Sequence, residues 1–362
     1  MNPFVQRRQR LGRALKAEHL DALLITKTVN VTYLTGFTGD SSYLILTPKK
    51  TLLISDFRYA QQIEEECPGL ETIIRPSTQP VQAASAEALT RLRCRAVGFE
   101  SSSVSVADHE KLRELAPTVE WKGAADRVEQ LRIIKDAGEI AAIRTAIGAA
   151  ERAFDMFRAM LRPTDNEKEL ADALEGYVRR AGGRRTSFAP IVAVGPRAAL
   201  AHATPGSQRV DEAGLLLVDW GAETALYKSD LTRVLATRRI SPKLEKVYAV
   251  VSRAQEKAIR AVRPGAEAKK VDAEARGHIQ DEGFGKYFDH GLGHGIGLEI
   301  HEAPSVRASS EDRLQPGMVL TIEPGIYIPG WGGVRLEDDV LVTEDGCEVL
   351  SQVSKELTCV FD

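Results

Sequence analysis

The sequence predicts an α+β protein in which a smaller α/β domain precedes a larger domain of helices and strands. Short apolar runs with β character alternate with helical segments over the first third of the chain. A long tract with helical spacing follows, and strand candidates separated by glycine pairs fill the C-terminal part. With 362 residues the chain can bury two cores. We expect domains at residues 1–126 and 127–362.

The N-terminal domain is expected to be an α/β layer without a cluster of metal-type ligands. An amphipathic helix is predicted to start near residues 11–15, and another helix over residues 57–66. Taken alone, residues 30–37 are interpreted as a strand and turn with packing aromatics. The predicted strands are 22–25, 43–46 and 51–54.

The second domain is expected to begin with two helices. From about residue 131, apolar positions recur at helical spacing as far as Pro163, which ends the tract. A further helix over residues 167–181 stops at a glycine pair, a common C-terminal signal. The residues predicted to form the packed stripe of the first helix are Glu139, Ile143, Ile147, Ala150 and Phe154.

Two aspartates follow apolar runs that predict an antiparallel hairpin. Asp219 ends the run at residues 215–218, and Asp230 lies in the segment 226–232. A register symmetric about Thr224 and Ala225 would pair Asp219 with Asp230. Directly opposed like charges destabilise a ladder, so this pair favours a shared cation over a scaffold role.

Residues 290–301 carry glycine at every second position of their first half and three histidines. This spacing disfavours a helix and leaves one strand face open to a neighbouring backbone or a ligand. In an extended chain His290 and His294 point to one side, whereas His301 has opposite parity and needs a turn or bulge to join them. Hydrogen-bonded histidines in an ordinary strand are the alternative.

Two carboxylates lie at predicted strand ends further on. Glu323 follows a strand over residues 318–322, before a Pro-Gly turn pair. A strand over residues 334–342, after the turn at Gly332-Gly333, would place Arg335 and Glu337 on one face with Asp339. Arg335 could orient Glu337, bind a substrate carboxylate, or form an ordinary ion pair.

These ligands, if they converge, place four carboxylates in one pocket. Mutual repulsion and lost hydration would protonate them unless cations balance the charge, and two divalent ions would do so. Such a metal pair activates water and polarises a carbonyl, so we expect a dinuclear metallohydrolase. Carboxylates with one imidazole suit Mn²⁺, Co²⁺ or Zn²⁺, and Mn²⁺ is preferred. The predicted ligands are Asp219, Asp230, His294, Glu323 and Glu337.

Three segments closely resemble the metal-binding blocks of the Xaa-Pro peptidases, the aminopeptidase P and prolidase branch of the methionine aminopeptidase–creatinase superfamily. The segments are VDWGAETALYKSDLTR, HGLGHGIGLEIHEAP and TIEPGIYIPGWGGVRLEDDVLV. The resemblance implies a C-terminal pita-bread metallopeptidase domain after a creatinase-type N-terminal domain. It also implies that Asp219 binds one metal, His294 and Glu323 the other, and that Asp230 and Glu337 bridge them.

The resemblance also assigns roles around the metals. It makes Glu323 the proton shuttle, and His202 and His301 catalytic residues near the scissile carbonyl or the developing oxyanion. His290, Arg335 and His202 would contact the substrate. In this mechanism a metal-bridging hydroxide attacks the peptide carbonyl, and no covalent intermediate is needed.

The expected activity is hydrolysis of the peptide bond before proline in small peptides with proline at the second position. The first hypothesis is an Xaa-Pro aminopeptidase, and the alternative is an Xaa-Pro dipeptidase (prolidase). A metal-free creatinase-like hydrolase and a non-catalytic binding protein on the same fold are disfavoured, because the ligand set is complete. By resemblance, we expect a homodimer.

Composition excludes other classes of protein. A formal net charge of −3 argues against a broad nucleic-acid surface. No apolar stretch is long enough to span a bilayer, and the N-terminus lacks a signal core, so we expect no membrane partner. The four cysteines form no C-x-x-C pair and are interpreted as reduced thiols of a cytoplasmic protein.

Overall fold

The computed structural model describes residues 2–361 and contains two compact units, Met1–Arg132 and Ile133–Asp362. The predicted boundary after residue 126 falls before the short helix α6 (Glu129–Arg132), which bonds to the first unit. Asn30 Nδ2 donates to Glu129 Oε1 at 2.8 Å, and Arg132 donates to Asn30 Oδ1 at 2.8 Å. These bonds hold α6 in the first unit.

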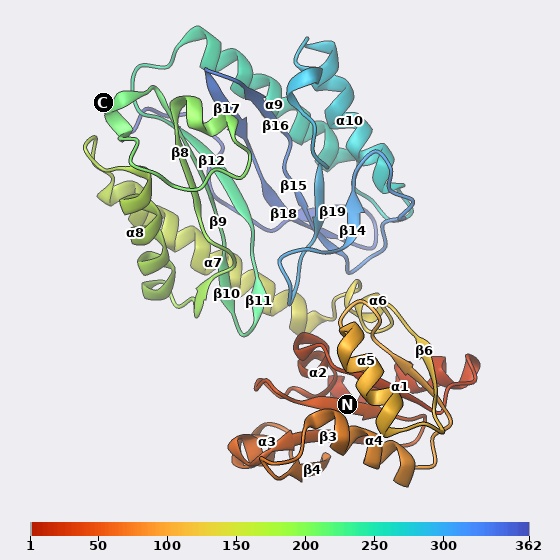
Figure 1. The fold of residues 1–362 in the computed structure, drawn as a ribbon. Coiled ribbons are helices and arrows are strands. Elements are labelled where there is room, and N and C mark those ends of the chain that lie inside the picture. The colour runs from red at the N-terminus through yellow and green to blue at the C-terminus, as the bar shows by residue number, and fades with distance from the viewer. Residues whose placement is uncertain (1, 362) are drawn as a thin grey trace. The chain divides into compact units, whose positions relative to one another are not determined.

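The first unit, red to orange-yellow in Figure 1, is built on a six-stranded sheet with the order β4-β3-β2-β1-β5-β6. Neighbours pair in parallel except in β1-β2-β3, which is an antiparallel meander. The strands are β1 (Ala22–Ile25), β2 (Tyr43–Leu46), β3 (Thr51–Asp56), β4 (Glu71–Arg75), β5 (Ala96–Phe99) and β6 (Glu120–Gly123). The three strands predicted from the sequence are confirmed.

The helices of this unit include one that replaces a predicted strand and turn. Its other helices are α1 (Pro3–Ala17), α3 (Ala60–Glu66) after a 3-10 turn η1 (Phe57–Tyr59), α4 (Val81–Arg91) and α5 (Val106–Leu115). The strand-turn interpretation of residues 30–37 is wrong, because α2 (Thr28–Thr35) occupies them. Gly36 ends α2 at a φ of 85°, and Asn30 is fully buried with its amide on Glu100 at 2.6 Å. A long-range polar contact therefore stabilises a segment rich in β-branched residues as a helix.

Two helix pairs enclose the strands of the second unit, which is the predicted pita-bread arrangement. The helices are α7 (Ala137–Met160), α8 (Glu167–Arg180), α9 (Pro242–Ala261) and α10 (Ala268–Asp281), with 3-10 turns η2 (Gly195–Ala199), η3 (Val210–Glu212) and η4 (Gly285–Tyr287). In Figure 1, α7 and α8 flank the strands on one side, and α9 and α10 pack together on the other. The α+β prediction for this domain is confirmed, as are the helical stripe of α7 and the end of α8 before Gly182.

The strands of this unit belong to four small sheets. One has the order β12-β9-β8, formed by β8 (Ile191–Val194), β9 (Leu215–Trp220) and β12 (Leu231–Ala236). The largest has the order β14-β13-β15-β18-β19, formed by β13 (Gly293–Gly295), β14 (Glu302–Val306), β15 (Val319–Ile322), β18 (Asp338–Val342) and β19 (Cys347–Val349). The others pair β16 (Gly325–Ile328) with β17 (Gly332–Arg335), and β10 (Ala222–Thr224) with β7 (Arg185–Thr186) and β11 (Tyr227–Lys228).

The hairpin that carries the two aspartates has a different register from the predicted one. Asp219 faces Thr232 across β9 and β12, so the expected direct pairing with Asp230 is wrong. The turn consists of Ala225 and Leu226, with φ of 47° and 72°, a left-handed pair that usually contains glycine or asparagine. The shift is two residues, so parity is kept and both aspartates remain on one face.

The predicted strand over residues 334–342 is also wrong as a single element. It divides into β17 and β18, which belong to different sheets, and Glu337 lies between them in an isolated bridge to Thr232. Gly332 and Gly333 lie inside β17 rather than in the turn before it. The break allows Arg335 and Glu337 to approach the same site from the ends of two sheets.

Within residues 2–361, no helix is both long enough and apolar enough to cross a membrane. All four cysteines are free thiols.

Candidate metal centre

A cavity of about 610 Å³ in the second unit is lined by every residue that the sequence predicted for the site. Sites for small molecules commonly have volumes of about 300–1,000 Å³. The predicted residues that line it are Asp219, Asp230, His294, Glu323, Glu337, His202, His290, His301 and Arg335. Residues up to 135 positions apart, His202 and Glu337, therefore converge as expected, although two of the predicted strand geometries were wrong.

Strand alternation aims the two aspartates into the cavity. In β9, Leu216 and Val218 pack toward α7 and α8, so Asp219 points to the opposite side with Leu217. Asp230 lies just before β12, and its backbone N–H donates to Asp339 Oδ2 at 3.1 Å. Both aspartates are buried.

His294 is at the centre of the acidic groups. Its Nε2 lies 3.7 Å from Asp230 Oδ2 and 3.6 Å from Glu323 Oε1. One ligand atom each from Asp230, His294 and Glu337 lie within 4.8 Å of one another. Glu323 follows β15, and Glu337 accepts a bond from Thr232 Oγ1 at 2.6 Å. Four of the predicted ligands thus surround one small volume.

Glycines allow the close packing that brings His294 there. A Cβ on Gly293 would collide with the Thr321 carbonyl, and one on Gly295 with the Ala303 carbonyl. Backbones therefore approach β13 closely, as the glycine spacing predicted. The strand itself is shorter than expected, because only Gly293–Gly295 is extended and His290 precedes it in an irregular segment.

The hydrogen bond of His294 to the Gly295 carbonyl determines which ring nitrogen carries the hydrogen and which has a free lone pair. Its Nδ1 is 3.0 Å from the Gly295 carbonyl, which can only accept, so Nδ1 carries the hydrogen. Burial lowers the pKa of His294 to about 4, so the ring is neutral at pH 7. The Nε2 lone pair is then directed at the oxygens of Asp230 and Glu323. Such an arrangement of electron pairs can hold a cation between the three groups.

The surroundings of the cavity raise the pKa values of its carboxylates. Burial, followed by repulsion from Glu337, raises the pKa of Asp230 well above its ordinary value. Burial and repulsion from Glu323 do the same for Glu337, and burial raises the pKa of Glu323 to about 8. Burial likewise raises the pKa of Asp219, against the opposing charge of Arg335.

The donor set fits divalent cations. Among the described residues, Asp219 Oδ1 is buried without a hydrogen-bond partner. An unsatisfied buried carboxylate oxygen is costly, and metal coordination is one way to satisfy it. Together with the His294 lone pair and the crowded carboxylates, this oxygen supports a metal centre at the predicted ligands.

A hydrogen-bonded chain connects Arg335 to His290 through a tyrosine that the sequence analysis missed. Arg335 donates to Tyr327 Oη at 2.7 Å, and Tyr327 Oη lies 3.0 Å from His290 Nε2. His290 Nδ1 contacts the Gly291 carbonyl at 2.8 Å, so Nδ1 donates there and Nε2 accepts from Tyr327. Both ring nitrogens of His290 thus have protein partners.

Arg335 is buried and connects several parts of the site. It forms an ion pair with Asp219 and donates from Nε to Thr232 Oγ1 at 3.1 Å. It also contacts the Ala201 carbonyl at 3.3 Å, next to His202. Of the alternatives considered for Arg335, the ion pair exists, but its partner is Asp219 rather than Glu337 or Asp339.

His202 and His301 are the exposed histidines of the cavity. The ring of His301 lies edge-on to that of His294, with centroids 4.4 Å apart. Burial lowers the pKa of His301. His202 lies in the irregular segment between η2 and η3. Their exposure leaves both rings accessible to a ligand in the cavity.

Sequence reasoning missed Thr232, Tyr327 and Arg307. Thr232 bonds Glu337 and Arg335, and Arg307 lines the cavity as an exposed cation just beyond β14. The motif that contains Glu323 and Glu337 also contains Tyr327, but nothing in its spacing indicates a partner. Thr232 lies two residues after Asp230 on the same strand face, and this parity could have identified it.

Comparison with known proteins shows which family the chain matches. Residues 141–344 match Metallopeptidase family M24, and residues 7–134 match the Creatinase/Prolidase N-terminal domain. An Xaa-Pro dipeptidase of Pyrococcus horikoshii is 35% identical over 339 residues, which cover 93% of this chain and 94% of that protein.

Solved structures agree with these matches. An Xaa-Pro dipeptidase from Bacillus anthracis superposes with a TM-score of 0.95 at 35% identity, covering 98% of this chain and 99% of that one. An X-Pro aminopeptidase from Thermotoga maritima gives a TM-score of 0.89 at 33% identity, covering 96% and 99%. The resemblance found in the three sequence segments is confirmed. The chain belongs to metallopeptidase family M24 and carries the family's creatinase/prolidase domain at its N-terminus.

Proposed function

We propose that this metallopeptidase is an exopeptidase that hydrolyses the bond before proline in small peptides, with Xaa-Pro dipeptides as its first substrate class. The observation that carries the proposal is the His294 Nε2 lone pair, held 3.7 Å from Asp230 and 3.6 Å from Glu323 among buried carboxylates. The relatives from P. horikoshii and B. anthracis named as Xaa-Pro dipeptidases support the substrate class.

Two divalent ions would be held by the five predicted ligands. When bound, they supply a water of lowered pKa and polarise the scissile carbonyl. Mn²⁺ remains the preferred ion, with Co²⁺ and Zn²⁺ as alternatives, on the grounds of ligand chemistry. The ligands are Asp219, Asp230, His294, Glu323 and Glu337.

The protein's own groups would move protons and hold the substrate. Glu323 takes the proton of the attacking water on its carboxylate and passes it to the departing proline nitrogen. His202 and His301, exposed in the cavity, donate hydrogen bonds to the carbonyl oxygen as it gains charge. His290 and Arg335, predicted to bind substrate, have donors and acceptors engaged within the protein, which favours a role in orienting Tyr327 and Asp219.

Arg307 distinguishes a dipeptide from a longer substrate in this proposal. A dipeptide ends in a free carboxylate directly after proline, and a guanidinium in the cavity can bind it through two hydrogen bonds. A tripeptide has an amide at that point. The second candidate is an Xaa-Pro aminopeptidase, which the relative from T. maritima named X-Pro aminopeptidase favours.

Assays with Mn²⁺-loaded protein on Ala-Pro, Ala-Pro-Ala and Ala-Ala test the proposal. We expect turnover of Ala-Pro, weaker turnover of Ala-Pro-Ala and none of Ala-Ala. Preference for Ala-Pro-Ala would select the aminopeptidase instead, and turnover of Ala-Ala alone would refute proline specificity. Arg307→Ala should raise KM for Ala-Pro about tenfold, equivalent to roughly 1.4 kcal/mol, with little change for Ala-Pro-Ala. Arg313→Ala, an exposed arginine that does not line this cavity, is the matched control.

Assembly and location follow the sequence-based expectation. We propose a homodimer in the cytoplasm, supported by the family resemblance and by reduced cysteines. Light scattering of the purified protein tests the dimer, and a monomeric mass would contradict it.

A further inference from the structure

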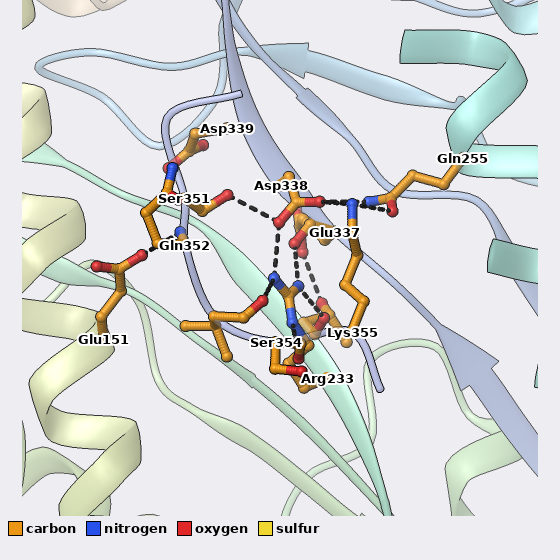
Figure 2. A network of polar contacts seen from close by, with 12 residues as sticks. Glu151, Arg233, Gln255, Glu337, Asp338, Asp339, Ser351, Gln352, Ser354 and Lys355 are labelled. Carbon is orange, nitrogen blue, oxygen red and sulfur yellow. Dashed lines mark hydrogen bonds and ion pairs between the residues drawn. The ribbon is translucent and has the colours of Figure 1, made fainter. Parts of the chain in front are cut away.

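A buried polar network lies next to Glu337, and its side chains Arg233, Gln255, Asp338 and Lys355 do not line the cavity (Figure 2). Its centre is Asp338, the next residue, whose side chain is 1% exposed. Asp338 accepts from Arg233 at 2.7 Å, from Lys355 at 2.7 Å and from Ser351 Oγ at 2.8 Å. Every oxygen of this carboxylate is therefore satisfied by groups of the chain.

Arg233 connects this network to the backbone of the metal centre. Its Nη1 donates to the carbonyl of Glu337 at 2.6 Å and to that of Thr232 at 2.9 Å. Its Nη2 donates to the carbonyl of Val353 at 2.8 Å, and Nε lies 3.3 Å from the Ser354 carbonyl. One planar guanidinium thus fixes the position of Glu337 relative to the chain after β19.

Gln255 of α9 extends the network to a second predicted ligand. Its Nε2 donates to the carbonyl of Ile322, the residue before Glu323, and to Asp338 Oδ2, each at 3.1 Å. Its Oε1 accepts from Lys355 Nζ at 3.1 Å. The end of β15 and the start of β18 are therefore held to the same group of side chains.

The C-terminal segment at residues 350–361 supplies part of this network, although it has almost no regular secondary structure. It contributes Ser351, Lys355 and the carbonyl of Ser354 (Figure 2). It also contributes the carbonyl of Val353. The buried donors of Arg233 and Gln255 are satisfied by backbone carbonyls, and two of these carbonyls belong to Glu337 and to the residue before Glu323.

We propose that Arg233, Asp338, Gln255 and Lys355 are positioning residues that fix the carboxylates of Glu337 and Glu323 for metal binding, so that the C-terminal segment is a working part of the metal centre. The proposal rests on the metal role given to those two carboxylates above. Groups that orient metal ligands usually change metal affinity or activity by about 10–100-fold when they are altered.

Arg233→Lys tests the proposal, because it keeps the positive charge near Asp338 and removes the planar set of donors to Glu337, Thr232 and Val353. Glu223→Gln is the matched control: Glu223 is also 1% exposed and ion-paired, with Lys228, Arg185 and Arg184, but it does not line the cavity. Metal-free protein is titrated with MnCl₂, and bound metal is counted. We expect Arg233→Lys to weaken Mn²⁺ affinity about 10–100-fold, while Glu223→Gln lowers the melting temperature and leaves affinity within twofold.

Lys355→Met is a milder change that keeps the proposal testable if Arg233→Lys does not fold, since Lys355 is 32% exposed. We expect weaker Mn²⁺ binding and an altered visible spectrum of the Co²⁺-loaded protein. Unchanged affinity and spectrum in whichever of the two variants folds, beside a wild-type protein that binds two Mn²⁺, would overturn the positioning role alone. A wild-type protein that binds no Mn²⁺ would instead refute the proposed metal centre.

Discussion

Glu337 and Asp338 are neighbours in the chain and both are buried, yet their surroundings shift the pKa values of the two carboxylates in opposite directions. Burial alone would raise the pKa of Asp338, but the charges of Arg233 and Lys355 outweigh it and lower the pKa. Burial and the charge of Glu323 raise the pKa of Glu337 well above its ordinary value. We call Asp338 the rear carboxylate, and Asp230, Glu323 and Glu337 the front carboxylates. The rear carboxylate is neutralised by the protein's own cations. The front carboxylates are neutralised by protons or by cations from outside.

This difference distinguishes two kinds of buried acidic residue, those paired with cations of the protein and those that are not. A carboxylate paired with arginine and lysine stabilises a fold only while both partners remain, because an unpaired buried charge is costly. Carboxylates gathered without enough cations indicate a site for a charged ligand. Changes on the two sides should therefore affect stability and activity in different ways.

Asp230→Asn tests the front side and should have the largest effect. It removes one charge and one oxygen donor from the group formed with His294 and Glu337, so we expect turnover of Ala-Pro to be abolished and bound Mn²⁺ to decrease. Activity assays and metal counting measure both. Asp345→Asn, on the exposed loop before β19, is the control. Full activity of Asp230→Asn with two bound ions would exclude Asp230 as a ligand.

Asp338→Asn and Glu337→Gln test the comparison directly, because they make the same chemical change one residue apart. Without metal, Asp338→Asn leaves Arg233 and Lys355 without their partner and should cost about 3–5 kcal/mol of unfolding free energy. Glu337→Gln relieves repulsion and should leave the metal-free protein equally or more stable. Urea unfolding in EDTA at neutral pH measures both. Equal destabilisation by the two changes would mean that the surroundings of Glu337 and Asp338 do not differ as proposed.

A third buried carboxylate, Glu167, resembles Asp338 in being fully satisfied. It is 0% exposed and accepts from Arg197 at 2.7 Å and from the backbone N–H groups of Val194 and Gly206, each at 2.8 Å. These bonds hold both ends of the segment that carries His202. Glu167 thus orients a proposed catalytic group rather than a metal ligand.

Glu167→Gln should therefore lower kcat for Ala-Pro about tenfold, roughly 1.4 kcal/mol, without changing Mn²⁺ affinity. Steady-state kinetics and metal titration separate the two effects. Glu169→Gln, which alters the capping box of the same helix, controls for loss of helix stability. Weaker metal binding with unchanged kcat would contradict the assignment.

The sequence predicted the composition of the site better than its geometry. The five proposed ligands lie in or beside strands within specific motifs, so local patterns were sufficient to predict that they line one cavity, and parity kept Asp219 and Asp230 on one face. The register failed because the turn at Ala225 and Leu226 contains no glycine or asparagine to mark it.

Long-range contacts explain the other differences. The break between β17 and β18 depends on pairing with strands far away in sequence, and α2 depends on Asn30 bonding to Glu100 and Glu129. Tyr327 gains its role only when the β16-β17 hairpin brings it to His290. The network around Asp338 was also missed. Arg233 and Asp338 lie in strands whose sequence pattern does not indicate a contact, and they meet only because β12 packs against the C-terminal segment.

The pH dependence of stability gives the smallest and most general test of the comparison. Glu323 is an acid whose pKa rises to about 8 through burial, so the folded metal-free protein holds its proton more tightly than the unfolded chain does. An acid with a raised folded pKa contributes stability below its unfolded pKa of about 4.3 and loses it as pH rises to the folded value. Asp338, with its lowered pKa, has the opposite sign and loses its contribution as pH falls.

In EDTA, the melting temperature should therefore decrease from about pH 5 to about pH 8, where unfolded carboxylates are already ionised. Saturating Mn²⁺ should remove this slope, because bound cations favour the ionised carboxylates. Glu323→Gln should flatten the metal-free profile while Glu348→Gln, an exposed acid paired with Arg144, should not. A metal-free melting temperature that rises over this range would mean that the front carboxylates are already balanced by the protein, and the contrast with Asp338 would fail.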